Sequence, residues 1–285
     1  MQKSIADPTT TASGPTPKAS LLSLRNLHKR FGKLVVLNGV SLEIEEGKTI
    51  VILGPSGTGK SVLLKHIVGL LRPDKGEVWF DGKRIDDQPE RNLTDYRKNF
   101  GFLFQMGALF DSLNNLDNVA FPLVEHSTFD KEKIAELAQE KLRMVGLPEV
   151  GKKMPGELSG GQRKRVALAR AIAMGPRVIL YDEPTTGLDP IRSDVINELI
   201  LKLQRELNVT SIVVTHDMNG AFKVADRMVL LTDGKVRFDG TPEEIRTTDD
   251  EIVRQFIAGE AGVAELESLR SNGQSVEPQM EEDKK

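Results

Sequence analysis

The sequence contains no cysteine. The chain can therefore have neither a disulfide framework nor a thiolate metal site, but its length lets it bury a sizeable core without either. It also lacks an apolar run near the roughly 20 residues that cross a bilayer, and its start lacks the charged and apolar segments of a secretory signal. We therefore expect a cytoplasmic protein that needs a partner to hold it at a membrane.

A large excess of one charge is missing as well. Aspartate and glutamate number 42 against 39 lysines and arginines, which leaves a formal net charge of −3. The two signs are interspersed, whereas a nucleic-acid-binding protein is expected to carry a basic patch or stripe. Nucleic acid is therefore not an expected partner.

The composition changes twice along the chain. Residues 1–20 are rich in Ser, Thr, Pro and Ala, which predicts a disordered tail. Residues 21–258 carry the periodic patterns of strands and helices and predict a folded domain. Residues 259–285 become polar and predict a second tail. With 285 residues, the chain has room for one large domain or two small ones.

The folded part has an α/β pattern. Apolar runs, apolar–polar alternation and a turn at Asp233-Gly234 predict strands at residues 34–46, 48–53, 177–181, 211–215 and 227–239. Helical periodicity predominates between about 98 and 172, where Asp130 can cap a helix that Gly146 closes. Another helix is expected to begin near Gly59 and run towards Pro73.

Residues 54–61 read Gly-Pro-Ser-Gly-Thr-Gly-Lys-Ser and match G-x-x-x-x-G-K-[ST] between a predicted strand and a predicted helix. In such a loop, backbone N–H groups converge on phosphates at the start of a helix. Lys60 would reach the β- and γ-phosphates, and Ser61 would ligate Mg²⁺. The alternative is a glycine-rich turn that binds nothing. The ATP-binding residues predicted here are Gly54, Pro55, Ser56, Gly57, Thr58, Gly59, Lys60, Ser61 and Val62.

The predicted strand at 177–181 is followed by two adjacent acids, Asp182 and Glu183. Neighbouring carboxylates repel each other, which suggests two roles rather than one. Asp182 would position Mg²⁺, and Glu183 would polarise the attacking water. The alternative is a solvated acidic turn, and the phosphate loop argues against it.

The segment Leu158-Ser159-Gly160-Gly161-Gln162 predicts a second anion site. Ser159 is a good N-cap, the two glycines expose backbone N–H groups, and a helix is expected to follow. Because the chain already has one phosphate loop, a second anion site makes sense if it serves another protomer. A capped helix start without a ligand is the alternative.

This segment resembles, complete and unaltered, the signature sequence of ABC transporter ATPases, and the resemblance extends over roughly residues 22–258. It implies that two copies of the domain close head to tail. Each ATP would then lie between the phosphate loop of one chain and the signature of the other. The resemblance adds four ATP-binding residues: Ser159, Gly160, Gly161 and Gln162.

Four further positions are similar to functional residues of that family. Gln105 stands where the family has a metal- and water-sensing glutamine, and His216 where it has the histidine that contacts the γ-phosphate. Asp189 belongs to a loop that crosses the dimer interface. Phe31 matches the aromatic residue, usually Tyr, that stacks on adenine, although it could instead belong to the core. The resemblance thus implies catalytic residues Lys60, Gln105, Glu183 and His216 and Mg²⁺ ligands Ser61, Gln105 and Asp182.

The fold implied by the resemblance is a P-loop NTPase cassette. It has a RecA-like α/β core, an antiparallel β layer and a helical subdomain. The helical subdomain should occupy about residues 98–172, with Gln105 near its start and the signature near its end.

Three segments narrow the resemblance to the ATPases of the Mla system and its relatives with Mce-domain partners: residues 61–66, 101–113 and 118–123. The resemblance implies a phospholipid-transfer motor that maintains outer-membrane lipid asymmetry. Its expected partners are ATP, a second copy of the chain, an integral-membrane permease and an Mce-domain lipid-binding protein. It would lie on the cytoplasmic face of the inner membrane. One departure is Asn114-Asn115-Leu116, where relatives commonly have a Thr-Val pair before Asp117-Asn118.

Two other functions stay open. An exporter or lipoprotein-release system would use the same motor with a different permease. A soluble ABC protein acting on ribosomes or DNA usually carries two cassettes or a long coiled-coil insertion, together with basic arms. This chain has one cassette and an acidic balance, which disfavours the soluble class.

Overall fold

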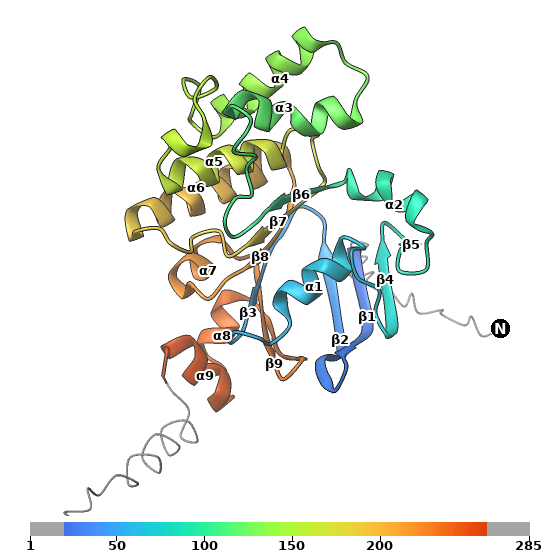
Figure 1. Ribbon diagram of the computed structural model, residues 1–285. Coiled ribbons are helices and arrows are strands. Elements are labelled where there is room, and N and C mark those ends of the chain that lie inside the picture. Colours follow the sequence, from blue (N-terminus) through green and yellow to red (C-terminus); the bar gives the residue numbers. More distant parts are fainter. Residues whose placement is uncertain (1–19, 261–285) are drawn as a thin grey trace, which may run out of the picture.

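The computed structural model describes residues 20–260, so most of both predicted tails lies outside the described residues (Figure 1). One of its two sheets is antiparallel, with the strand order β2-β1-β4-β5. Its strands are β1 (Ser20–Phe31), β2 (Leu34–Glu45), β4 (Lys75–Phe80) and β5 (Lys83–Arg84).

The second sheet has the order β10-β9-β3-β8-β7-β6. All of its neighbouring strands run parallel except β10, which pairs antiparallel with β9. The strands are β3 (Thr49–Leu53), β6 (Phe100–Leu103), β7 (Val178–Asp182), β8 (Thr210–Val214), β9 (Arg227–Thr232) and β10 (Lys235–Gly240). Because β3, β7 and β8 run the same way, their carboxyl ends meet at one edge of the sheet.

Helices connect and cover these sheets. They are α1 (Lys60–Ile67), α2 (Glu90–Arg97), α3 (Asn115–His126), α4 (Lys131–Met144), α5 (Gly160–Ala171), α6 (Pro190–Leu207), α7 (Met218–Val224), α8 (Pro242–Arg246) and α9 (Glu251–Ala258). Figure 1 shows α3 and α4 in a helical arm at the far end of the molecule from β1 and β2. No helix within residues 20–260 is both long and apolar enough to span a membrane.

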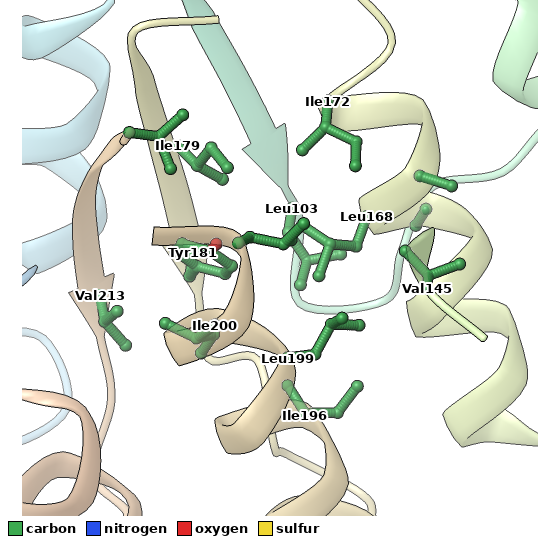
Figure 2. Packing of buried hydrophobic residues seen from close by; sticks show 14 of the residues in the cluster. Leu103, Val145, Leu168, Ile172, Ile179, Tyr181, Ile196, Leu199, Ile200 and Val213 are labelled. Carbon is green, nitrogen blue, oxygen red and sulfur yellow. The ribbon is translucent and has the colours of Figure 1, made fainter. Parts of the chain in front are cut away.

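The parallel sheet is buried on both faces. Along β3, Val51 and Leu53 belong to one hydrophobic cluster, whereas Ile50 and Ile52 belong to another. The first cluster joins the sheet to the helical arm and α6, and in Figure 2 Leu168 of α5 lies beside Leu103 of β6. The second joins the sheet to α1 and the antiparallel layer. Burial on both faces explains why β3 is a continuous apolar run rather than an alternating one.

The predicted strands are confirmed within a residue or two at each end. Helix α4 is confirmed with its cap, because the Asp130 side chain accepts a hydrogen bond from the backbone N–H of Lys133. Two details differ. Helix α1 ends at Ile67 rather than near Pro73, because Gly69 adopts a left-handed backbone with φ of 69°. Residues 100–103 lie within the stretch expected to be helical, but they form strand β6, which pairs with β7.

Candidate nucleotide-binding site

The site forms where three parallel strands end side by side. Ile52 of β3 pairs with Val214 of β8, and Asp182 of β7 pairs with the same Val214. The backbone N–H of Glu183 donates to the Val214 carbonyl at 2.9 Å. The phosphate loop after β3, the two acids after β7 and the residues after β8 therefore emerge at one edge of the sheet, as expected for ligand sites in open α/β sheets.

The backbone of the phosphate loop requires its glycines. A Cβ on Gly54 would lie 2.2 Å from the carbonyl oxygen of Leu231, and one on Gly59 would lie 2.9 Å from that of Val36. Gly59 also has φ of 96° and forms the N-cap of α1 without any side-chain capping bond. The first N–H groups of α1 are thus left without a side-chain acceptor, which is the arrangement that binds anions.

Lys60 turns back over its own loop. Its Nζ donates to the carbonyl oxygens of Gly54 at 2.7 Å and Pro55 at 2.8 Å. Burial lowers the pKa of Lys60, and the charges of Glu183 and Asp182 oppose that effect. A cation held at the mouth of the loop, with acids facing it, matches a site for negatively charged oxygens. Val62, the next residue but one, packs partly buried against the core.

Ser61 and Asp182 bring two hard oxygen donors together. The Ser61 hydroxyl lies 3.5 Å from Oδ1 of Asp182. Burial, and next the charge of Glu183, raise the pKa of the Asp182 carboxyl. Such a partly desolvated carboxylate lacks a full counter-charge, and an oxygen donor set of this kind suits Mg²⁺. Residues 20–260 hold no cluster of three or more acids and histidines that would bind a metal alone.

Glu183 and His216 face each other. Nδ1 of His216 lies 2.8 Å from Oε2 of Glu183, and the Thr186 hydroxyl donates to the same oxygen at 3.3 Å. The His216 side chain is 69% exposed and that of Glu183 15%. Glu183 has φ of 51°, a left-handed backbone that non-glycine residues seldom adopt and that is frequent at functional sites.

The signature segment lies elsewhere. At the start of α5, Ser159 and Gln162 cap each other: the Ser159 hydroxyl accepts from the Gln162 N–H, and the Gln162 side chain accepts from the Ser159 N–H. A Cβ on Gly160 would lie 3.7 Å from Leu188, which is in the loop before α6. Among the described residues, no hydrogen bond joins positions 158–162 to the phosphate loop.

The remaining predicted residues lie at the ends of other elements. Gln105 is exposed and lies two residues past the end of β6, whose last residue, Leu103, pairs with Tyr181 of β7. Asp189 caps α6 by accepting from the N–H of Arg192. Phe31 ends β1, is 48% exposed rather than part of the core, and has the Lys29 ammonium 5.6 Å from its ring.

Comparison with known proteins decides the family. Residues 37–186, more than half of the chain, match the family described as ABC transporter. The chain belongs to the ABC transporter family. It is an ABC-type ATPase, as the sequence predicted, and a cassette fold of this kind is confirmed by the solved structures that it resembles.

The relatives of this ABC ATPase carry two kinds of name. It is 44% identical over 242 residues, 85% of this chain and 92% of the relative, to the intermembrane phospholipid transport system ATP-binding protein MlaF of Haemophilus influenzae. It is also 44% identical over 246 residues, 86% of this chain and 71% of the relative, to the probable ribonucleotide transport ATP-binding protein mkl of Mycobacterium leprae. A dimeric ATP-binding cassette solved in a post-hydrolysis state with ADP and Pi is 38% identical, covers 78% of this chain and 98% of its own, and superposes with a TM-score of 0.71.

The sequence analysis missed one residue of this ABC ATPase that touches the site. Lys164 of α5 is buried, and its Nζ lies within hydrogen-bonding distance of three backbone carbonyls that follow β7, those of Glu183, Pro184 and Thr186. In the sequence, Lys164 stands three positions before Ala167 and four before Leu168. This spacing places a lysine on the apolar face of an amphipathic helix, which was the available signal.

Proposed function

We propose that the chain is the ATP-hydrolysing motor of a transport complex that moves phospholipid between the inner and outer membranes. The relatives named MlaF support the cargo, and the Asp182–Glu183 pair at the mouth of the phosphate loop supports the motor. The observation that carries the motor assignment is the 2.8 Å contact between Glu183 and His216 beside Lys60 and Ser61. In this proposal the ATPase domain spans residues 21–258, with a helical subdomain at about residues 98–172.

The phosphates of ATP would lie in the loop of residues 54–61. The uncapped N–H groups of α1 would donate to phosphate oxygens, and Lys60 would exchange its loop carbonyls for the β- and γ-phosphates. The exposed face of Phe31 would stack on adenine. Ser61, Asp182 and Gln105 would hold Mg²⁺, which when bound would neutralise charge on the β- and γ-phosphate oxygens.

Glu183 would orient the water that attacks the γ-phosphate and accept its proton. In the described state its carboxylate is engaged by His216 and Thr186. The exposed imidazole of His216 would leave Glu183 and donate to the γ-phosphate as the site closes. In this proposal the contact between His216 and Glu183 must break before hydrolysis. This requirement suits an ATPase that is active only when the dimer is closed.

A second copy of the chain would complete the site. The start of α5 makes no hydrogen bond to its own phosphate loop, so Ser159–Gln162 would serve the ATP held by the partner. Asp189, in the loop beside Gly160, would lie at the same interface. The dimeric cassette that this chain resembles supports a dimer.

A permease would bind beside Gln105. An open groove of about 590 Å³ lies there, and three of its phenylalanines, Phe104, Phe110 and Phe121, are more than a third exposed. Arg97 and Lys98 lie at the same groove. We call this the phenylalanine groove. An amphipathic helix of an integral-membrane partner would bury its apolar face there. That contact would hold the chain at the cytoplasmic face of the inner membrane, in a complex that includes an Mce-domain lipid-binding protein.

The proposal is tested by purifying the tagged chain from gently solubilised membranes and identifying its partners by mass spectrometry. The purified complex is then reconstituted in vesicles to measure ATP-dependent transfer of phospholipid. We expect a permease with an Mce-domain protein, and transfer that E183Q abolishes. A different permease without lipid transfer would favour the exporter or lipoprotein-release alternative, and hydrolysis with no membrane partner would favour a soluble role.

The phenylalanine groove supplies a matched pair of variants. F121D places a charge in the groove and should release the permease while ATP binding is kept. F129D alters another exposed phenylalanine, between α3 and α4, that is not among the groove residues, and should leave the complex intact. Retention of the permease by F121D would contradict the groove assignment.

A further inference from the structure

Lys164 occupies an unusual place for a lysine. It lies in the middle of α5 and is only 6% exposed, among the apolar residues that fix this helix to the sheet. Burial lowers its pKa to about 8, whereas the charge of Glu183 raises it. A buried ammonium group is unfavourable unless its donors are satisfied. The contacts that satisfy this one all come from a single short loop.

That loop begins at the proposed catalytic base. Nζ of Lys164 donates to the carbonyl oxygens of Pro184 at 2.8 Å and Thr186 at 2.7 Å, and lies 3.3 Å from that of Glu183. An ammonium group has three N–H donors, so these three carbonyls can accept all of them. No other described hydrogen bond joins α5 to these carbonyls.

The backbone held in this way is strained. Glu183 has φ of 51°, a conformation that persists only when the surroundings impose it. Its N–H is bonded to Val214 of β8, and its carbonyl faces Lys164. The same carbonyl also accepts from the Thr186 N–H at 3.3 Å, so both peptide groups of Glu183 are held by hydrogen bonds. These hydrogen bonds therefore set the direction in which its carboxylate leaves the backbone.

We propose that Lys164 is a positioning residue that holds Glu183 in its catalytic orientation and thereby couples the signature helix to the base of the same chain. The inference rests on the proposed function, in which Glu183 is the base. In a head-to-tail dimer, the start of α5 contacts the ATP of the partner's phosphate loop. Lys164 lies five residues after Ser159 on that helix, so a shift of α5 at one ATP site reaches the base of the other.

The first test compares K164M with R165M in the full-length chain. Met has about the length of Lys but no donors, so the Glu183 loop loses its tether. We expect kcat to fall about 10- to 100-fold, as misplacement of a reacting group does, with KM for ATP within about twofold of the wild type. Arg165 is the matched control, because it also donates to backbone carbonyls, those of Val145 and Gly146 at the end of α4, away from the site. R165M should retain kcat.

K164R and a double mutant separate positioning from folding. K164R keeps a cation with several donors, so its kcat should lie between those of K164M and the wild type. If K164M proves too unstable to purify, K164R takes its place in the comparison with R165M and in the double mutant. In the E183Q background, K164M should change the residual rate less than about twofold, because Lys164 acts through the base that is already lost. An equal loss of rate in both backgrounds, or wild-type kcat in K164M, would overturn the inference while leaving Glu183 as the base. Wild-type kcat in E183Q would instead overturn the base assignment, and this inference with it.

Discussion

The chain has two glycine-rich helix starts, and they are built in opposite ways. Helix α1 begins after Gly59, which has a left-handed backbone and provides no side-chain cap. Helix α5 begins after Ser159, whose hydroxyl and the Gln162 side chain close a reciprocal capping box. Both helix starts expose backbone N–H groups at the positive end of a helix dipole. Only the first leaves all of them without a side-chain acceptor.

The difference in capping indicates a different function for each helix start. The start of α1 has Lys60 within its loop and Asp182 and Glu183 facing it, so anion binding, metal binding and chemistry meet there. The signature Ser159–Gln162 contains no ionisable side chain and already satisfies two of its own donors. It can add hydrogen bonds to a phosphate held elsewhere, but it has no groups with which to hold one or hydrolyse it.

The largest expected effect comes from removing the proposed catalytic base beside the start of α1. E183Q should lower kcat for ATP hydrolysis about 10²–10⁴-fold, because an amide cannot accept the proton of the attacking water. ATP binding should be kept, since the amide has nearly the same shape as the carboxylate. Steady-state hydrolysis and equilibrium nucleotide binding measure the two quantities separately. Wild-type turnover would remove Glu183 as the base.

The next effect concerns binding of the phosphates. K60M should weaken ATP binding about 10- to 100-fold, the loss of a hydrogen-bonded cation worth ~1.5–3 kcal/mol. It also leaves the carbonyls of Gly54 and Pro55 without their donor. Titration of ATP in the absence of hydrolysis measures this loss. An unchanged affinity would mean that the N–H groups of α1 suffice for the phosphates.

Acid pH should weaken metal binding beside the start of α1, where Asp182 lies. The signature at the start of α5 has no ionisable side chain that would respond. The pKa of Asp182 is raised from the ordinary value of 3.8, so a proton competes for this carboxylate at a higher pH than for an exposed aspartate. Mg²⁺ requires the ionised form, so its affinity should fall as pH is lowered through the raised pKa, by about tenfold per pH unit below it. Metal titrations of the ATP-bound chain at several pH values measure this dependence. D182N should remove the contribution of this carboxylate and leave only the pH dependence of Mg²⁺ binding to ATP itself, whereas an unchanged pH dependence in D182N would point to another ligand.

The smallest effect is expected from a substitution at the start of α5. S159A removes the N-cap of α5 and should cost ~1 kcal/mol, which lowers Tm by about 2–4 °C in a domain of this size. Binding of ATP to the isolated chain should not change, because the phosphate loop is intact. Thermal unfolding and ATP titration check both statements. A fall in monomer affinity like that of K60M would show that the two ends act on one ATP within one chain.

Much of the site was predictable because its motifs are short and continuous. The phosphate loop, the acids after the predicted strand at 177–181 and the signature each depend on neighbours within a few residues, and the structure places the first two together. The arm boundary was less predictable. Residues 100–103 were expected in a helical stretch, and pairing with Val178–Tyr181, far along the chain, makes them a strand.

By itself, the sequence determined the strands, the caps and the glycine-dependent turns, because apolar periodicity and the backbone freedom of glycine are local properties. Only the tertiary structure decided that His216 meets Glu183 and that Lys164 holds the backbone after it. Those contacts depend on the order of strands in the sheet and on how α5 packs over it. A lysine on an apolar helix face can hold a loop only when backbone carbonyls with free lone pairs lie opposite it, and the order of strands in the sheet places them there.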